Sequence, residues 1–376
     1  MQQADILIIG GGIAGAAAGF ALAPQRRVIL LERESQPGYH STGRSAALFT
    51  EAYGNATIRA LTKASRAFFM GPPQGFTDHP LLTPRGIITI GRADQKDAVE
   101  AGFVEAHRHV KSVRRMTADQ ACTQLPVMRR DYVAHAFIEP EAMDIDVHAT
   151  HRGYLRGMTA AGGRIVTDAE VLALGRKDAD WQVETKAGAF SAPVVINAAG
   201  AWCDEIGKLA GLAPIGLVPK RRTALTFDLL AGQDPAPWPS MIDANEQFYF
   251  KPDAGRILAS PADETPMPPC DVQPDEMDIA ILIDRLEQAT TFQIRRIAAK
   301  WAGLRSFVSD KTLVAGFDKD APGFFWAAGQ GGYGIQTSPT MSRVVGALAL
   351  GEKLPADLVD AGVTEAALSP ARLRRS

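Results

Sequence analysis

Cysteine is scarce in this chain, which has only Cys122, Cys203 and Cys270 among its 376 residues, all far apart. An odd number of widely spaced cysteines predicts neither a disulfide framework nor a CxxC metal site, so we expect a reducing, cytoplasmic environment. An excess of charge of one sign is also lacking, since the formal net charge is −2. That balance gives no reason to expect a nucleic acid partner or an anionic membrane surface.

Long hydrophobic runs are lacking too, apart from the uncharged stretch 6–23. Asp5 precedes this stretch where a signal peptide would be basic, and glycines interrupt it, so we expect neither a signal peptide nor a transmembrane segment. Hydrophobic residues make up 46% and charged residues 22% of the chain. This composition is typical of a globular protein, and the length suffices for two domains with separate cores.

Residues 5–32 are typical of a nucleotide-binding strand, turn, helix and strand. The apolar run 6–9 predicts a strand buried on both faces of a parallel sheet. Gly10, Gly12 and Gly15 then fit G-x-G-x-x-G, in which the glycines allow a tight turn, close approach of a pyrophosphate and close helix packing. A helix over 13–23 and a strand over 28–31 follow, ending at Glu32. A carboxylate at that position suits a ribose hydroxyl and repels a 2′-phosphate, which favours NAD or FAD over NADP.

The pattern beyond residue 50 predicts a nucleotide-binding domain that is interrupted by β-rich segments. The class we expect is α/β (α+β overall), a Rossmann-like FAD-binding domain with an inserted β-rich substrate domain. The FAD-binding domain would comprise 1–50, 141–222 and 305–376, and the substrate domain 51–140 and 223–304. Helices are predicted at 55–69, 94–110, 154–161, 275–288 and 336–350, and strands at 86–90, 163–166, 169–174, 194–200, 223–227, 247–251, 256–259 and 323–329.

Two polar segments invite a functional interpretation. Two acids and two histidines lie in 144–151, but a capped helix with solvated histidines is the more frequent outcome, and we expect no metal. A second glycine-rich turn at 330–334 opens the helix over 336–350, so it supplies another helix N-terminus.

The sequence resembles the D-amino acid oxidase superfamily of FAD enzymes, which includes sarcosine and glycine oxidases. Four stretches carry the resemblance, and they are similar in particular to bacterial D-arginine dehydrogenases: 38–47, 219–222, 301–307 and 330–338. The similarity extends to 368–370 and so covers essentially the whole chain. Sarcosine oxidases attach their flavin through a cysteine before the last glycine turn, whereas this chain has none between Trp301 and Gly334. The resemblance therefore implies noncovalent FAD.

The resemblance also implies the positions that hold the cofactor. Glu32 would bind the adenosine ribose, Arg44 and the first glycine turn would lie near the pyrophosphate, and Val171 near the adenine. The turn that begins at Gly331 would lie beside the flavin. The full expected set is Gly10, Gly12, Ile13, Ala14, Gly15, Glu32, Arg33, Ser41, Thr42, Arg44, Ser45, Ala46, Val171, Ala199, Gly200, Gly331, Gly332, Tyr333, Gly334, Ile335 and Gln336.

The chemistry of amino acid oxidation defines what the substrate site must do, and the resemblance implies which residues would do it. The enzyme must hold a carboxylate, keep the amine neutral and direct the Cα–H bond at flavin N5. Arg305 and Arg222 are the candidate carboxylate clamp, since a planar guanidinium binds a carboxylate bidentately. Tyr53 and Tyr249 would close the site, and the Gly332 carbonyl would accept the substrate amine. No general base is assigned.

The side-chain pocket departs from the arginine-specific members. The resemblance places Leu48, Thr50 and Ile87 in this pocket, but those members have a glutamate at position 87 and a histidine at 48. Phe49 likewise replaces a tyrosine. A cationic side chain buried against Leu48 and Ile87 would lack a partner. We therefore expect neutral or apolar D-amino acids to be favoured over D-Arg and D-Lys.

The expected reaction is FAD-dependent oxidative deamination of a D-amino acid, giving an imino acid that hydrolyses to a 2-keto acid and ammonia. Oxidation of a secondary amine or a 2-hydroxy acid is an alternative, because the two arginines would serve those substrates equally well. A flavin-binding or electron-transfer subunit without turnover is an alternative of another class. Electrons could pass to O₂, to a soluble carrier, or to a quinone reached by peripheral membrane contact.

Overall fold

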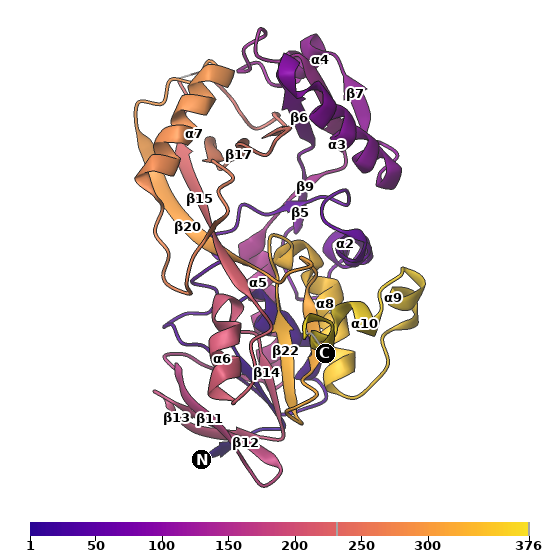
Figure 1. Cartoon of the computed structure of the whole chain (residues 1–376), viewed down its shortest axis with the longest axis vertical. Coiled ribbons are helices and arrows are strands. Elements are labelled where there is room, and N and C mark those ends of the chain that lie inside the picture. Colours follow the sequence, from indigo (N-terminus) through magenta and orange to yellow (C-terminus); the bar gives the residue numbers. More distant parts are fainter. Residues whose placement is uncertain (231, 375–376) are drawn as a thin grey trace.

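The computed structural model describes residues 1–230 and 232–374, and the chain forms an elongated molecule with two lobes (Figure 1). The lower lobe is built on a six-stranded sheet that is parallel except at β21. Its strands, in spatial order, are β10 (Arg164–Val166), β3 (Val28–Leu31), β2 (Ile6–Ile9), β14 (Val194–Asn197), β22 (Phe324–Ala328) and β21 (Val314–Phe317).

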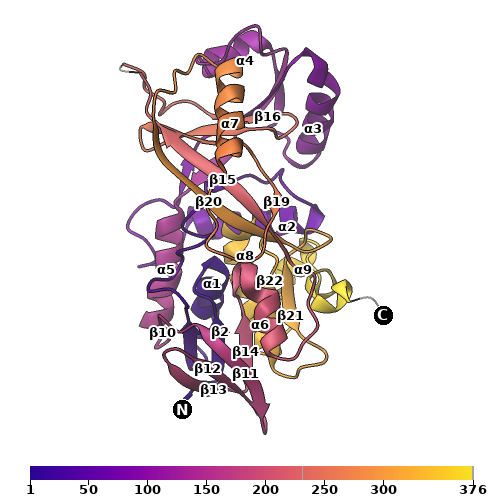
Figure 2. The same cartoon turned by 60° about the vertical axis from the view of Figure 1, so that its left-hand side comes forward.

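The two faces of β2 show why its residues are uniformly apolar. Ile6 and Ile8 pack among the helices on one face, and Leu7 and Ile9 pack into a second cluster on the other. The helices are α1 (Ile13–Leu22), α5 (Val147–Ala160) and α8 (Gly334–Ala349). The opposite layer, seen in Figure 2, contains α6 (Cys203–Leu209) and the sheet β1 (Gln2–Gln3), β13 (Gly188–Ala192), β12 (Asp180–Thr185) and β11 (Val171–Lys177).

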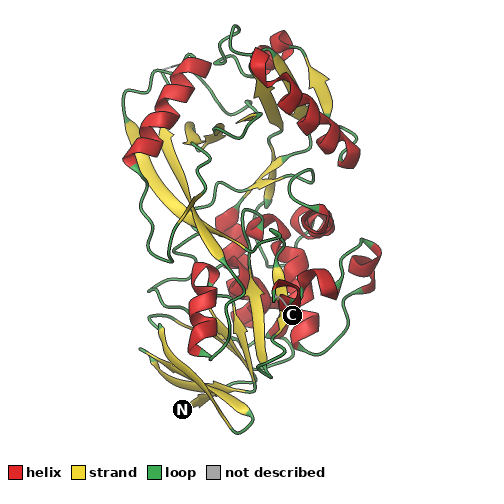
Figure 3. Cartoon of the chain, in the orientation of Figure 1, coloured by secondary structure: helices red, strands yellow, loops and turns green. Residues whose placement is uncertain are grey.

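The upper lobe is built on a mixed nine-stranded sheet. Its order is β19 (Thr265–Pro266), β15 (Val218–Phe227), β18 (Arg256–Ser260), β17 (Tyr249–Asp253), β16 (Ser240–Asp243), β6 (Ile87–Gly91), β8 (His135–Glu139) and β7 (Arg114–Met116), with β20 (Ile297–Phe307) paired to β15. The helices α3 (Lys96–His109), α4 (Ala118–Gln124) and α7 (Glu276–Ala289) pack on it. The long strands β15 and β20 reach from this lobe toward the lower one (Figure 3).

The remaining elements lie between the lobes and at the C-terminal end. A short sheet of β4 (Leu48–Phe49), β9 (Met143–Ile145) and β5 (Leu82–Pro84) lies near α2 (Ala56–Met70). The helices α9 (Ala356–Asp360) and α10 (Glu365–Leu368) lie near the C-terminal end. Within the described ranges, no helix has the length and apolar character needed to cross a membrane.

The predicted fold class is confirmed, while some element bounds were wrong. The helix expected at 154–161 begins at Val147, because the Asp146 carboxylate accepts the Ala149 N–H and caps it there. The helix expected at 336–350 begins at Gly334. The pattern missed β12, β13 and β20, although burial alternates along β12 and along the second half of β20. The proposed division into FAD-binding and substrate domains stays a prediction.

Candidate active site

The first glycine turn holds β2, α1 and the end of β14 in close contact. Gly10 has φ +106, and a Cβ there would lie 2.4 Å from the Ala198 carbonyl oxygen. A Cβ on Gly15 would lie 1.9 Å from the carbonyl oxygen of Gly10. Side chains at these two positions are therefore sterically excluded, and the backbone at the start of α1 stays accessible, as binding of a pyrophosphate requires.

Glu32 lies beside this turn with its carboxylate buried. Its Oε2 accepts the Gly11 N–H (2.8 Å) and its Oε1 accepts the Glu34 N–H (2.9 Å). Burial raises the pKa of Glu32, although these two N–H groups favour the ionised form. On the other side, His151 Nε2 lies 2.8 Å from the Gly11 carbonyl oxygen, so it donates a hydrogen bond to it. The expectation of solvated histidines in 144–151 was therefore wrong for His151, which is buried and supports the glycine turn.

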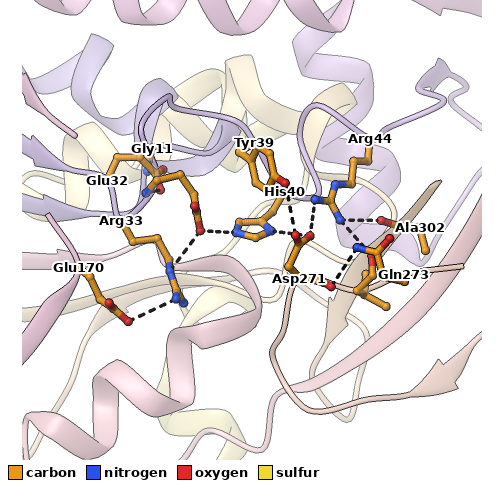
Figure 4. Close-up of polar contacts among 12 residues, drawn as sticks. Gly11, Glu32, Arg33, Tyr39, His40, Arg44, Glu170, Asp271, Gln273 and Ala302 are labelled. Carbon is orange, nitrogen blue, oxygen red and sulfur yellow. Dashed lines mark hydrogen bonds and ion pairs between the residues drawn. The ribbon is translucent and has the colours of Figure 1, made fainter. Parts of the chain in front are cut away.

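The segment 38–44 connects the first glycine turn to the other lobe. The Thr42 hydroxyl accepts the Ile13 N–H at the start of α1 (3.0 Å). The Arg44 guanidinium pairs with Asp271 (2.5 Å) and donates to the Ala302 carbonyl (3.0 Å). Figure 4 shows Arg44 and His40 on either side of Asp271. Arg44 is thus bonded to protein groups, and its expected contact with a pyrophosphate stays a prediction.

Charged side chains continue this connection toward the adenosine side of the predicted site. His40 Nε2 lies 2.8 Å from the Glu34 carboxylate, and Arg33 lies 3.3 Å from Glu34. Arg33 also lies 3.3 Å from Glu170 (Figure 4). The Arg33 guanidinium also lies over the Trp202 ring, 4.8 Å from its centroid. Arg33 is therefore held next to Glu32 by contacts from three separate segments.

A cavity of about 250 Å³ lies between the lobes and brings together most of the predicted site. The predicted residues that line it are Ile13, Ser41, Thr42, Arg44, Ser45, Ala46, Leu48, Thr50, Tyr53, Ile87, Arg222, Tyr249, Arg305, Gly331, Gly332, Gly334, Ile335 and Gln336. The predicted residues outside its lining are Gly10, Gly12, Ala14, Gly15, Glu32, Arg33, Val171, Ala199, Gly200 and Tyr333. Most of the latter lie around the first glycine turn and the ends of β3, β11 and β14.

Arg305 is the cation that faces this cavity without a protein partner. It lies on β20, and its guanidinium makes no hydrogen bond or ion pair with any residue in the described ranges. A Cβ built on Gly332 would lie 3.2 Å from Nη1 of Arg305, so the glycine leaves room for this side chain. An arginine stays charged in proteins, and its five N–H donors are here available to an anion in the cavity.

Arg222 differs from Arg305, although the same strand pair carries both. Its Nε donates to the Asp263 carbonyl (2.9 Å), and its Nη2 lies 3.2 Å from Glu264. Lys220 also pairs with Glu264 (2.9 Å). Arg222 therefore has fewer free donors than Arg305, and we expect a smaller share in carboxylate binding.

Two tyrosines at the site, Tyr53 and Tyr333, are neutral. The rings of Tyr53 and Tyr333 lie 5.1 Å apart, and burial raises the pKa of both phenols. They can donate and accept hydrogen bonds but are not bases near neutral pH. Tyr249 lines the same cavity from β17.

Two acidic residues of this region escaped the sequence interpretation. Glu246 lines the cavity from an exposed turn, in which its φ is +52. Glu139 lies behind Thr50, which donates its hydroxyl hydrogen to the carboxylate (2.8 Å). Burial raises the pKa of Glu139 to about 7, against the hydrogen bond from Thr50. No local pattern distinguishes Glu139, because its burial results from pairing between distant strands.

The raised pKa of Glu139 predicts a pH-dependent stability. Its carboxyl binds a proton more tightly in the folded state than in the unfolded chain, where the pKa is near 4.5. The resulting stabilisation is present below pH 4.5 and is lost as the pH rises to about 7. The unfolding free energy of the wild type, relative to that of Glu139→Gln, should therefore fall by about 3 kcal/mol between pH 4.5 and a pH above 7. Thermal unfolding across this range measures it, and a constant difference in Tm would contradict the assignment.

Comparisons with known proteins agree with the fold and with a requirement for FAD. The protein family described as FAD dependent oxidoreductase matches residues 5–348. Glycine oxidase of Geobacillus kaustophilus (strain HTA426) is 23% identical over 99% of this chain and 97% of its own length. The crystal structure of glycine oxidase from Geobacillus kaustophilus superposes with a TM-score of 0.81, at 22% identity and over 97% of this chain and 99% of that chain.

Two further solved structures share the fold. Iminodiacetate oxidase from Chelativorans sp. BNC1 has a TM-score of 0.81 at 20% identity, covering 97% of this chain and 98% of that one. L-proline dehydrogenase from P. horikoshii has a TM-score of 0.81 at 19% identity, covering 99% and 98%. Identities at this level establish the shared fold and leave the substrate open.

Proposed function

Because this chain belongs to the family of FAD-dependent oxidoreductases, we propose that it is an FAD enzyme that oxidises a D-amino acid to an imino acid, which water hydrolyses to a 2-keto acid and ammonia. The observation that carries this proposal is the Arg305 guanidinium, which is charged and has no hydrogen-bond or ion-pair partner among residues 1–230 and 232–374, at an otherwise largely apolar cavity. The Arg305 side chain is half-buried, so an anion beside it would compensate its charge, and the carboxylate of an amino acid supplies one.

The proposed cofactor site fits the residues around the first glycine turn. Side chains are excluded at Gly10 and Gly15, so the start of α1 can receive a pyrophosphate. Glu32 would bind the ribose through the carboxylate that now holds the Gly11 N–H. The residues from Gly331 to Gln336 would lie beside the flavin, with no cysteine between 301 and 334 to attach it. FAD, when bound, would supply the acceptor for the hydride, and so for the two electrons, lost from Cα.

The remaining residues would orient the substrate. Arg305 would bind the carboxylate, assisted by Arg222, while the Gly332 carbonyl accepts a hydrogen bond from the amine. Tyr53 and Tyr249 would close the site and limit the rotation of the substrate. The two tyrosines would not act as bases toward the Cα–H bond, because in the proposed reaction this hydrogen leaves as hydride.

Secondary amine oxidation is a second candidate reaction. The name of one solved structure of this fold, iminodiacetate oxidase, supports this alternative, because iminodiacetate is a secondary amine that carries carboxylates. Arg305 would bind those carboxylates equally well. A 2-hydroxy acid, and a flavoprotein without turnover, are the further alternatives.

The test is the anaerobic absorbance spectrum of the purified flavoprotein during addition of D-amino acids, L-amino acids, sarcosine, proline and 2-hydroxy acids. We expect rapid flavin reduction by neutral D-amino acids. Reduction by secondary amines or hydroxy acids alone would replace the substrate class, and no reduction by any of them would favour a non-catalytic flavoprotein. Reoxidation by O₂, a soluble carrier and a quinone in separate samples then identifies the electron acceptor.

The residue at position 87 predicts the outcome for basic substrates. Ile87 lines the cavity with Leu48, and neither can pair with a guanidinium. We expect D-Leu or D-Met to exceed D-Arg in kcat/KM, and Ile87→Glu to raise the D-Arg value about tenfold or more by providing a charged partner. Steady-state kinetics with the three amino acids measure this. Ile87→Gln, of similar size and neutral, is the matched control, and a wild type that prefers D-Arg would contradict the expectation.

A further inference from the structure

A buried carboxyl group lies directly behind the wall of the cavity, at the end where the proposed substrate side chain would be. The two oxygens of Glu139 lie 2.9 and 2.8 Å from Oγ1 of Thr50. Ile87 is the direct cross-strand partner of Glu139, and side chains paired in this way point to the same face of the sheet. Thr50 and Ile87 line the cavity whereas Glu139 does not, and Glu139 is bonded to the Thr50 hydroxyl, so Thr50 links the carboxyl group to the cavity wall.

Hydrogen bonds hold the groups around Thr50 in place, so its hydroxyl hydrogen is the one that can turn. The Thr50 N–H donates to Oε1 of Gln336 (3.3 Å), and Nε2 of Gln336 donates to the Thr62 hydroxyl (3.0 Å). Thr62 in turn donates to the Ile58 carbonyl (2.9 Å). These bonds fix the Thr50 backbone and the Gln336 amide, so the partner of the Thr50 hydroxyl decides what that hydroxyl presents to the cavity.

We propose that Glu139 is a positioning residue that sets the hydrogen-bonding polarity of Thr50 and thereby selects the substrate side chain. This rests on the proposed function. An ionised Glu139 only accepts, so Thr50 donates to it and turns its lone pairs toward the cavity. A protonated Glu139 donates to Thr50, whose own hydrogen is then free to point into the cavity. The ionised form favours neutral D-amino acids whose side chain carries a hydrogen-bond donor over those whose side chain carries only an acceptor.

The charged groups around Glu139 place this change near neutral pH. Burial raises the pKa of Glu139 to about 7, opposed by the hydroxyl of Thr50 and by the N–H groups of Glu51 and Ala52. The Glu51 carboxylate raises it further. That carboxylate is paired with Arg66 of α2 (2.6 Å), which also lies 4.0 Å from Glu141. The preference between donor and acceptor side chains should therefore differ between pH values below and above about 7.

Three D-amino acids with side chains of equal length provide the probe. D-Homoserine ends in a hydroxyl, O-methyl-D-serine carries an ether oxygen that only accepts, and D-norvaline is apolar. Well above pH 7 we expect kcat/KM for D-homoserine to exceed that for O-methyl-D-serine about tenfold, mainly through KM, which corresponds to one hydrogen bond. Well below pH 7 the ratio should approach one. The effect of pH on the substrate amine is common to both amino acids and cancels in this ratio. D-Norvaline is the apolar reference of the same size.

Variants assign the effect to Glu139. Glu139→Gln should make the ratio independent of pH, and Thr50→Val should abolish it, while Thr50→Ser should keep it. Glu141→Gln is the matched control, because Glu141 is exposed and lies two residues away on the same segment. A ratio that does not change with pH in the wild type would overturn the proposal, as would a pH dependence that survives in Glu139→Gln.

Two measurements work without turnover. The infrared band of a protonated carboxyl should titrate near pH 7 in the wild type, persist in Thr50→Val and be missing from Glu139→Gln. Should none of the three amino acids reduce the flavin, the proposed reaction fails, and their binding is then read from the perturbation of the flavin absorbance. A pH-dependent affinity ratio would still support the role of Glu139, and equal affinities at both pH values would refute it.

Discussion

Arg305→Met should lower kcat/KM for the best amino acid substrate by about 10³-fold. Loss of one partner of a buried, hydrogen-bonded charge pair costs about 2–5 kcal/mol, which corresponds to a factor of this size. In this variant the substrate carboxylate would enter the cavity without the Arg305 guanidinium that is proposed to bind it. Steady-state kinetics and anaerobic flavin reduction at several substrate concentrations would separate the effects on KM and on the rate of reduction.

Three further variants show whether this loss belongs to carboxylate binding. Arg305→Lys should recover part of the activity, because a lysine keeps the charge without the bidentate geometry. Arg222→Met should cost less, since Arg222 already bonds Asp263 and Glu264. Arg296→Met, at an exposed position of the segment before β20, should change nothing. Equal losses in Arg305→Met and Arg296→Met would rule out the proposed clamp.

Gly15→Ala should abolish FAD binding and lower the free energy of unfolding by about 3 kcal/mol. The new Cβ would lie 1.9 Å from the carbonyl oxygen of Gly10, a backbone atom that cannot move without displacing the turn. Gly10 itself is closely packed against the Ala198 carbonyl at the end of β14. The flavin content of the purified protein and its thermal unfolding measure the two effects.

Gly102→Ala is the matched control for this substitution. Gly102 also lies in a helix, α3, but a Cβ there would lie 3.4 Å from the Phe137 ring, an ordinary contact. We expect a gain of about 0.5–1 kcal/mol, because alanine has the higher helix propensity. A Gly15→Ala protein with full flavin content would show that the turn relaxes, which would remove the steric basis of the proposed cofactor site.

The cofactor side of the site was predictable because its signals are local. The glycines at 10, 12 and 15, the buried strands on either side and Glu32 lie within thirty residues of one another. Their geometry follows from steric limits that act along the chain. The family and the FAD requirement are confirmed by the match over residues 5–348. The narrower resemblance to D-arginine dehydrogenases and the roles of single residues stay predictions.

The substrate side depends on contacts that no local pattern contains. The sequence made Arg222 and Arg305 equivalent, whereas pairing with Glu264 distinguishes them in the fold. Glu139 faces Thr50 across 89 positions of sequence, so its burial could not be read from its neighbours. His151 was expected at the surface for the same reason, because the carbonyl to which it donates belongs to Gly11, which is distant in sequence.

The order of strands in the six-stranded sheet has a consequence for synthesis of the protein. β2 pairs with β14, and β14 pairs with β22, which ends at Ala328. In a growing chain, the edge of β14 that pairs with β22 therefore stays unpaired until residue 328 has left the ribosome. Contacts this distant in sequence form slowly, and an open strand edge invites association with other chains. The parallel sheet that builds the nucleotide site is thus completed late, and chaperones would act most usefully before β22 emerges.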